Sequence, residues 1–121
     1  MKSITKIQFL RSGLITSLQG KQINNQQHLG ITTSGPMDYF LSNMGNIILD
    51  NHKDDLCFEI SKFGPKIKVI EGKFIFLVSG KINFNIISNS KISSGKSFKS
   101  YILESGDILE LNETINSNYA Y

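Results

Sequence analysis

The sequence contains few of the residues that build cross-links, metal sites or nucleic-acid surfaces. Its 121 residues include one cysteine, Cys57, which excludes an internal disulfide. There are two histidines, and no cysteine or carboxylate stands at ligand spacing from them, so we expect no metal site. Arg11 is the single arginine and the lysines are scattered one by one, which argues against binding to nucleic acid.

Long apolar runs are also missing. No run reaches the roughly 18 residues that a membrane-spanning helix needs, so we expect no contact with a membrane. Residues 1–6 carry no apolar segment after their charges and do not resemble a signal peptide. These features lead us to expect a cytoplasmic protein. Cys57 lies in a strand-like run and is expected to be a buried, inert thiol.

The pattern of apolar residues predicts a mainly β protein with one amphipathic helix, an α+β chain. A length of 121 residues suffices for one domain with its own core. Short strands at regular spacing with turn signals between them favour a barrel or a sandwich. The predicted strands cover residues 6–10, 14–18, 56–63, 66–70, 73–79, 82–87, 97–103 and 108–111.

The predicted helix covers residues 36–49. Pro36 suits the first helical position, and Asp38 would then lie in the first turn, where a carboxylate meets the positive end of the helix dipole. Apolar residues that recur at helical spacing, and are expected to face the core, are Met37, Phe40, Leu41, Met44, Ile47 and Ile48. The polar residues expected on the other side are Asp38, Ser42, Asn43, Asn46 and Asp50.

The loop before this helix is the strongest candidate for a binding site. Free backbone amides at the start of a helix can hold an anion or a carbonyl oxygen. Ser34, Gly35 and Asp38 lie at this junction. They form either a polar pocket or an ordinary helix start, in which Ser34 or Gly35 is the N-cap and Asp38 favours the dipole. Gln27 and His28 precede the loop; His28 either joins the site or bonds to local backbone. Ser34 lacks the Gly-x-Ser-x-Gly context of a nucleophile.

Five segments, in order along the chain, resemble one known family. Residues 13–19 read Gly-Leu-Ile-Thr-Ser-Leu-Gln, and residues 34–38 read Ser-Gly-Pro-Met-Asp. Residues 44–51, 58–65 and 77–80 continue the series with a helix end, a Phe-Glu-Ile…Gly-Pro pair and a Leu-Val-Ser-Gly turn. In order and spacing these segments are similar to the biotin-dependent carboxyltransferase family. That family includes one of the subunits of 5-oxoprolinase, the antagonist of the sporulation-kinase inhibitor, and allophanate hydrolase subunit 2.

The resemblance implies a partial cyclophilin-like β-barrel. Residues 1–121 would be a single domain, the N-terminal part of a carboxyltransferase domain of subdomain A and B type, cut short at its C-terminus. Asn46 and Glu59 match family positions and are added to the pocket by the resemblance. From the residues alone, Asn46 could equally be a solvated helix residue and Glu59 a carboxylate on a wet sheet face. The expected substrate-binding set is Gln27, His28, Ser34, Gly35, Asp38, Asn46 and Glu59.

The implied function is that of a subunit or fragment in an ATP-dependent 5-oxoprolinase or a urea-carboxylase-like complex that acts on a small amide. The chain would share its pocket with a sister subunit of the 5-oxoprolinase type that is related to the kinase inhibitor, or with the remaining half of a split domain. The sequence has no motif for ATP or for biotinylation, so partner subunits would supply these cofactors and the chain alone would be inactive. The alternatives are a non-catalytic module that docks and regulates the sister subunit, or an inactive remnant.

The chain also departs from the family pattern. Residues 20–23 read Gly-Lys-Gln-Ile, where the family usually has an Asp-Leu-Gly-Arg run. The acid and the arginine are missing, and with them two charges that could pair or hold an anionic substrate. A function that needs those charges is therefore not expected here.

Overall fold

The computed structural model of the chain describes residues 4–20, 35–115 and 119–121, and these form ten strands and one helix. The prediction of a mainly β chain with one helix is confirmed. The elements, in chain order, are β1 (Lys6–Arg11), β2 (Ile15–Gln19), α1 (Tyr39–Ile48), β3 (Cys57–Ser61), β4 (Lys66–Glu71), β5 (Phe74–Leu77), β6 (Ile82–Ser88), β7 (Lys91–Ser94), β8 (Ser100–Leu103), β9 (Ile108–Thr114) and β10 (Tyr119–Ala120).

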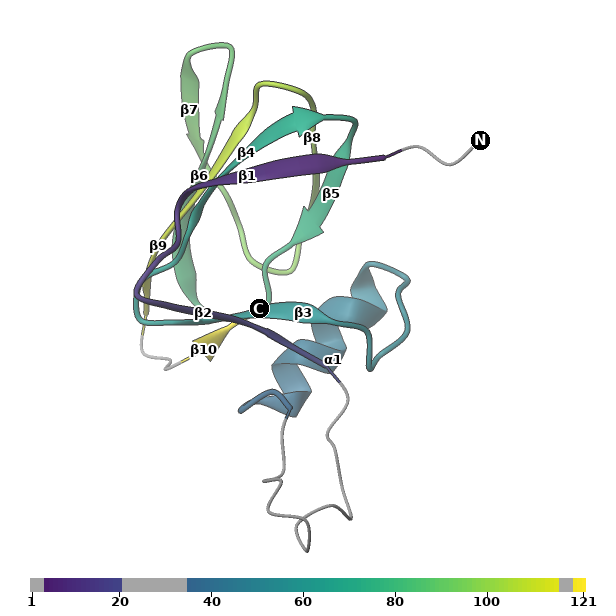
Figure 1. The fold of residues 1–121 in the computed structure, drawn as a ribbon. Coiled ribbons are helices and arrows are strands. Elements are labelled where there is room, and N and C mark those ends of the chain that lie inside the picture. Colours follow the sequence, from purple (N-terminus) through teal and green to yellow (C-terminus); the bar gives the residue numbers. More distant parts are fainter. Residues whose placement is uncertain (1–3, 21–34, 116–118) are drawn as a thin grey trace, which may run out of the picture.

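The strands form three open antiparallel sheets rather than one closed barrel (Figure 1). One sheet has five strands in the order β1-β4-β9-β6-β7, a second pairs β5 with β8, and a third has the order β10-β3-β2. The core joins all three sheets, with side chains such as Ile67 of β4, Phe76 of β5 and Ile60 of β3 in one cluster. This arrangement agrees with the expected partial barrel.

Arg11, the single arginine of the sequence, makes contacts that join separate strands. The guanidinium of Arg11 donates a hydrogen bond to the carbonyl oxygen of Leu111 at 2.8 Å and a longer one to that of Gly64. Its carbon also lies 4.4 Å from the centre of the Phe63 ring, at cation–π distance. Arg11 therefore connects the end of β1 to β9 and to the segment after β3.

Two strands escaped the sequence analysis, the two-residue β10 and the hairpin strand β7. β7 pairs with β6 across a turn at Asn89 and Ser90, whose φ angles of 51° and 63° lie in the left-handed region. Two such residues in succession form the tight turn that suits the twist of a hairpin. The exposed strand is short and carries no apolar alternation, so its pattern was indistinguishable from that of the turns on either side.

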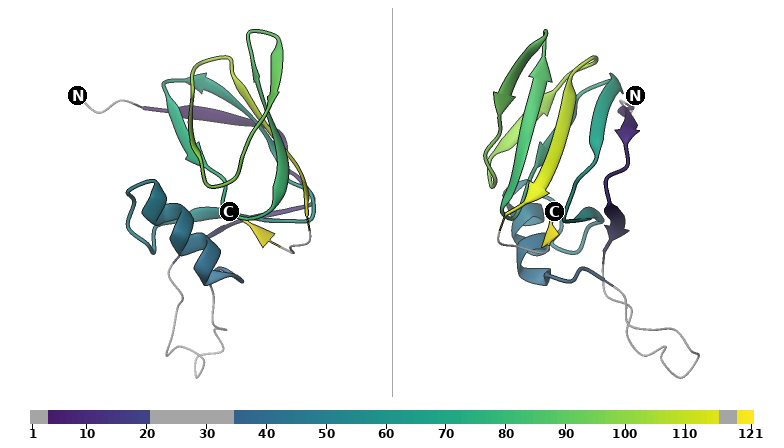
Figure 2. Two further views of the ribbon diagram at one scale, coloured as in Figure 1. Left: turned by 180° about the vertical axis from the view of Figure 1, so that it is seen from behind. Right: turned by 90° about the vertical axis from the view of Figure 1, so that its left-hand side faces the viewer.

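Helix α1 lies beside β3 on the side of the molecule away from β7 (Figure 2). It begins at Tyr39, and Asp38 is its N-cap, with the Leu41 amide donating to Asp38 Oδ1 at 3.1 Å. The expectation that Pro36 opens the helix and that Asp38 lies in the first turn is therefore wrong. Aspartate is among the best capping residues, and here it ends the extended backbone two residues after Pro36. No helix in the described ranges is long and apolar enough to cross a bilayer.

The predicted orientation of α1 is also wrong. Phe40 and Ile47 are 70% and 62% exposed, whereas Ser42 and Asn46 are buried. The reason is close packing through the small face of the helix. A Cβ atom on Gly45 would lie only 3.1 Å from the Cβ of Ser79. The hydroxyl of Ser79 donates to the Leu41 carbonyl at 2.6 Å, so the helix is held with its apolar side outward.

Asn46 fixes the loop that follows α1, which gives a test of this packing. Its Nδ2 donates to the carbonyls of Lys53 at 3.2 Å and Asp55 at 3.0 Å. We predict that Asn46→Ala lowers the free energy of unfolding by about 1–3 kcal/mol, because it leaves buried polar groups unpaired. Urea denaturation measures the change. Asn43→Ala, on the same helix, is the control and should cost clearly less; equal losses would contradict this role for Asn46.

Candidate functional site

The start of α1 meets β3 and the last residue of the chain in a buried polar junction. Glu59 of β3 and Tyr121 are each 8% exposed. The Tyr121 hydroxyl donates to Glu59 Oε2 at 2.6 Å and accepts from the Asp38 amide at 2.9 Å. The Met37 amide donates to the same Glu59 oxygen at 2.8 Å. We call these four residues, Met37, Asp38, Glu59 and Tyr121, the helix-start junction.

Strand pairing brings the members of the junction together. β3 lies between β2 and β10, with Glu59 opposite Ser17 and Ile60 opposite Ala120. Tyr121 then follows directly. Its amide donates to the Ser79 carbonyl at 2.8 Å, and the Ser79 amide donates back to the Tyr121 carbonyl at 2.6 Å. Both ends of Tyr121, backbone and hydroxyl, are thus anchored to distant parts of the chain.

The hydrogen bonds of the helix-start junction limit which groups of the predicted pocket are free to bind a ligand. The amides of Met37, Asp38 and Leu41 have internal acceptors, so a ligand at this end of α1 would compete with Glu59, Tyr121 and the Asp38 side chain. The sequence analysis gave the cap to Ser34 or Gly35, whereas Asp38 is the residue that caps α1. Substrate binding by Asp38 and Glu59 stays a prediction, and the structure places the two beside each other.

The other predicted site residues divide into two groups. Gly35, with a left-handed φ of 129°, lies just before the junction, and Asn46 lies about two helical turns beyond it. Gln27, His28 and Ser34 fall outside the described residues. Of the alternatives for Asn46, a solvated position is excluded, because the residue is only 5% exposed and its amide binds two loop carbonyls.

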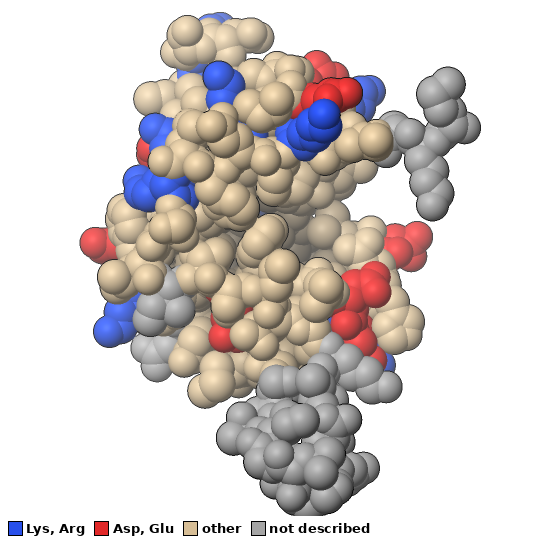
Figure 3. Space-filling view, in the orientation of Figure 1, with Lys and Arg blue, Asp and Glu red and all other residues tan. Residues whose placement is uncertain are grey.

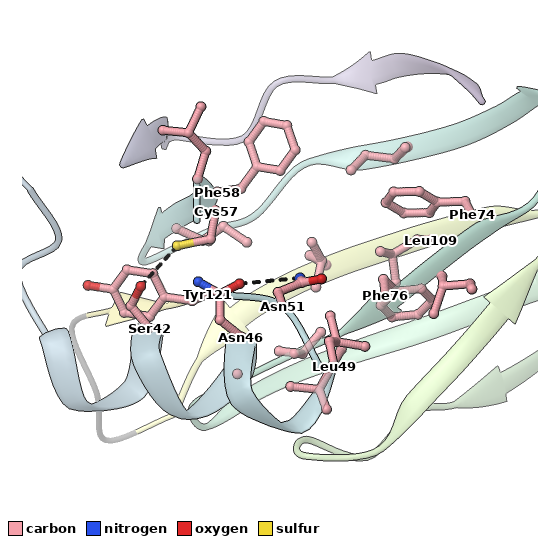
Figure 4. A pocket seen from close by; sticks show the side chains of 18 of the residues that line it. Ser42, Asn46, Leu49, Asn51, Cys57, Phe58, Phe74, Phe76, Leu109 and Tyr121 are labelled. Carbon is pink, nitrogen blue, oxygen red and sulfur yellow. Dashed lines mark hydrogen bonds between the residues drawn. The ribbon is translucent and has the colours of Figure 1, made fainter. Parts of the chain in front are cut away.

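A cavity of about 240 Å³ lies next to the junction, between α1, β3 and the core strands (Figure 4). Ser42, Asn46, Asn51, Cys57 and Tyr121 supply its polar groups. Phe74, Phe76 and Leu109 lie toward the opposite end in the close-up view, where the wall is apolar. The cavity therefore has one polar end, at the helix, and one apolar end.

Cys57 is a titratable group of the cavity wall with a shifted pKa. Burial raises the pKa of its thiol, the hydrogen bond with Ser42 opposes this rise, and the negative charge of Glu59 adds to it. The Ser42 Oγ lies 3.1 Å from Cys57 Sγ, which in turn donates to the Gln19 carbonyl at 3.7 Å. A thiol with a raised pKa is a poor nucleophile, since the thiolate is the reactive form.

Sequence reasoning missed Tyr121 and the pairing of Ser42 with Cys57. No local pattern indicates either contact, since each joins segments that only the folded sheets bring together. Within the described ranges, no group of three or more His, Cys, Asp or Glu side chains could hold a metal ion.

The comparisons with known proteins agree on one domain type. The sequence profile of the carboxyltransferase domain, subdomain A and B, matches residues 29–121. The fold is similar to parts of the Kluyveromyces lactis urea carboxylase and of the K. lactis urea amidolyase, each with a TM-score of 0.85 at 24% identity over 100% of this chain. A crystal structure of TTHA0988 matches with a TM-score of 0.82 at 16% identity over 97% of this chain. No curated protein sequence matches.

The chain corresponds to a small part of each of these longer proteins. It spans 10% of the urea carboxylase chain, 7% of the urea amidolyase chain and 23% of the TTHA0988 chain. At these identities the similarity to the solved structures concerns the fold. The match of the sequence profile, which covers most of the chain, concerns the family.

The electrostatics of Cys57 give opposite predictions for its two neighbours. Ser42→Ala should raise the thiol pKa further, because it removes the hydrogen bond that favours the thiolate. Glu59→Gln should lower the pKa, because it removes a nearby negative charge. The pH profile of alkylation by iodoacetamide measures both, with circular dichroism to confirm folding. Shifts in the same direction would contradict the assignment.

We expect the buried Tyr121 hydroxyl to make the free energy of unfolding decrease at high pH. Burial and the hydrogen bond to Glu59 raise its pKa above the ordinary value of 10.0. Above that pH the unfolded chain releases the phenolic proton while the folded chain keeps it, so stability that is fully present below pH 10 is lost as the pH rises. We predict that Tyr121→Phe weakens this alkaline loss in urea unfolding measured from about pH 8 to 11. Tyr101→Phe is the control, and an unchanged slope in Tyr121→Phe would contradict the prediction.

Proposed function

We propose that this chain, which belongs to the family of the carboxyltransferase domain, subdomain A and B, forms part of a larger assembly that acts on a small amide such as urea or 5-oxoproline. The family match and the fold shared with a urea carboxylase support the reaction class. The observation that carries the proposal is the outward apolar face of α1, which suits a chain that works only when packed against another.

The outward face of α1 forms a continuous apolar stripe. Phe40, Ile47 and Ile48 lie on one side of the helix, and Met37 lies just before it. Their exposed fractions are 68% for Met37, 70% for Phe40, 62% for Ile47 and 46% for Ile48. Contiguous apolar surface of this kind on a folded chain marks an interaction site. We call these four residues the helix stripe.

A second apolar region lies on β1, on β2 and on the connection between them. Phe9 and Leu10 of β1, Leu14 of the connection and Leu18 of β2 are exposed. Phe9 packs edge-on against Phe58 at 5.6 Å between ring centres. In the space-filling view, lysine and arginine side chains lie mainly toward the top and left of this face, and acidic side chains gather toward its right edge (Figure 3). Two such regions support an assembly in which other parts of a carboxyltransferase cover this chain.

The contribution of this chain to the reaction would be to bind and orient. Asp38 and Glu59 lie together beside Gly35, and Gln27, His28 and Ser34 belong to the segment that precedes them. In the proposed pocket these groups would hold the carbonyl or amide of the substrate while a partner supplies ATP or carboxybiotin. The chain is not expected to bind ATP itself: Gly95-Lys96-Ser97 resembles the end of a phosphate loop, but Ser90 replaces its first glycine and a strand follows.

Substitutions in the helix stripe test the assembly. We predict that Phe40→Ser combined with Ile47→Ser abolishes co-purification with a kinase-inhibitor-like sister subunit and, with it, ATP hydrolysis stimulated by 5-oxoproline or urea. The stripe is solvent-exposed in the isolated chain, so the variant should fold. Ile92→Ser, at a 69% exposed position on β7, is the matched control and should keep both properties. Association that survives in the double variant would overturn the proposal.

A non-catalytic docking module is the second candidate. It is favoured by the helix-start junction, in which Glu59 and Tyr121 already occupy the amides that a substrate would use. In the assembled complex, Asp38→Ser separates the two functions, because serine keeps the N-cap and removes the carboxylate. Loss of activity with retained association supports the pocket, whereas unchanged activity in Asp38→Ser and in Ser34→Ala assigns the chain to docking alone.

A further inference from the structure

The cavity beside α1 has the size and the wall of a small-molecule site. Its volume of about 240 Å³ exceeds the roughly 150 Å³ of an engineered apolar cavity that takes up benzene. Among the described residues that line it, none carries a charge. Most of the wall is aliphatic or aromatic and comes from β3, β4, β5 and β9. A charged ligand would lose part of its hydration there and find no counter-charge in the wall, which disfavours it.

The polar end of the cavity offers hydrogen-bond acceptors, among them the Ser42 hydroxyl and the amide oxygens of Asn46 and Asn51. Asn46 uses both amide hydrogens on loop carbonyls, and the Tyr121 hydroxyl is engaged with Glu59. Cys57 donates toward the Gln19 carbonyl, so the hydroxyl of Ser42 donates to the sulfur and keeps its lone pairs. Ser42 stands at this end in the close-up view, opposite Phe74 and Leu109 (Figure 4).

We propose that this cavity binds a small uncharged molecule with an apolar body and one hydrogen-bond donor, such as a simple phenol. The body lies against the apolar end, near Phe76 and Leu109, and the donor meets the Ser42 oxygen. The volume admits one substituted ring. This site adjoins the proposed amide pocket at the helix start and has Asn46 and Tyr121 in its wall, but it depends on Ser42 rather than on Asp38 or Glu59.

Cys57 reports occupancy, because it lies in the wall and is the one thiol of the chain. The experiment measures alkylation of Cys57 in the full chain with p-cresol, with toluene and with p-toluate. At about ten times its dissociation constant, p-cresol should slow alkylation roughly tenfold, since only the empty chain reacts. Toluene, which lacks the donor, should bind more weakly, and the anionic p-toluate should give no protection.

Two variants make the test specific. Leu49→Phe places a larger side chain in the half-buried part of the wall and should reduce the affinity for p-cresol at least several-fold, while Leu10→Phe, an exposed position outside the cavity, should not. Ser42→Ala should bring p-cresol and toluene to similar affinity, compared through the thermal shift that each ligand produces. An increase in Tm with p-cresol provides the same comparison without the thiol.

Three results would overturn the proposal. The first is an unchanged alkylation rate and an unchanged Tm with p-cresol in the parent chain. The second is equal affinity in Leu49→Phe and the parent, which would place the ligand elsewhere. The third is protection by p-toluate as strong as that by p-cresol, which would contradict an uncharged ligand.

Discussion

The buried hydrogen bond between Tyr121 and Glu59 connects β3, the end of the described chain and the start of α1. Glu59 belongs to β3, the central strand of the three-stranded sheet, and Tyr121 directly follows β10, an edge strand of that sheet. Both side chains accept a hydrogen bond from a backbone amide at the start of α1. A carboxylate with 8% exposure needs such partners, because an unpaired buried charge is strongly disfavoured. The carboxylate thus also serves as the negative group that a helix N-terminus favours. The last residue of the described chain is in this way a structural part of the helix start.

Helix α1 has one apolar face and one face of small and polar residues, and the second of these packs against the sheet. A single-sequence pattern shows which residues share a face, but it does not say which face meets the sheet. Packing through Gly45 and Ser42 permits a close approach to Ser79 and lets Asn46 hold the following loop. The apolar face then remains outside, where an isolated domain would gain nothing from it. This orientation is expected for a helix that is covered on both sides, on one side by its own sheet and on the other by a partner of the kind we propose.

Much of the fold was open to prediction, and the misses have physical causes. Alternation and turn residues located most strands, because those signals are local. The hairpin strand β7 was missed because its residues are exposed and carry no alternation. The start of α1 was misplaced because Pro36 and Asp38 are both good opening residues, and the contacts of Glu59 and Tyr121 decide between them. Tyr121 itself could not be predicted, since its role depends on pairing with Ser79, 42 residues earlier in the sequence.

The cavity is a further consequence of the same packing. A helix that meets a sheet through serine, glycine and asparagine brings little side-chain volume to the interface, and the larger side chains of the sheet do not fill the space alone. Had α1 turned Phe40 and Ile47 inward, those side chains would have occupied this region and the outer surface would have been polar. The empty volume inside and the apolar stripe outside therefore arise from one feature of the sequence, the placement of small residues on the inner face of the helix. The two proposals, a partner on the helix stripe and a small ligand in the cavity, therefore rest on the same packing arrangement.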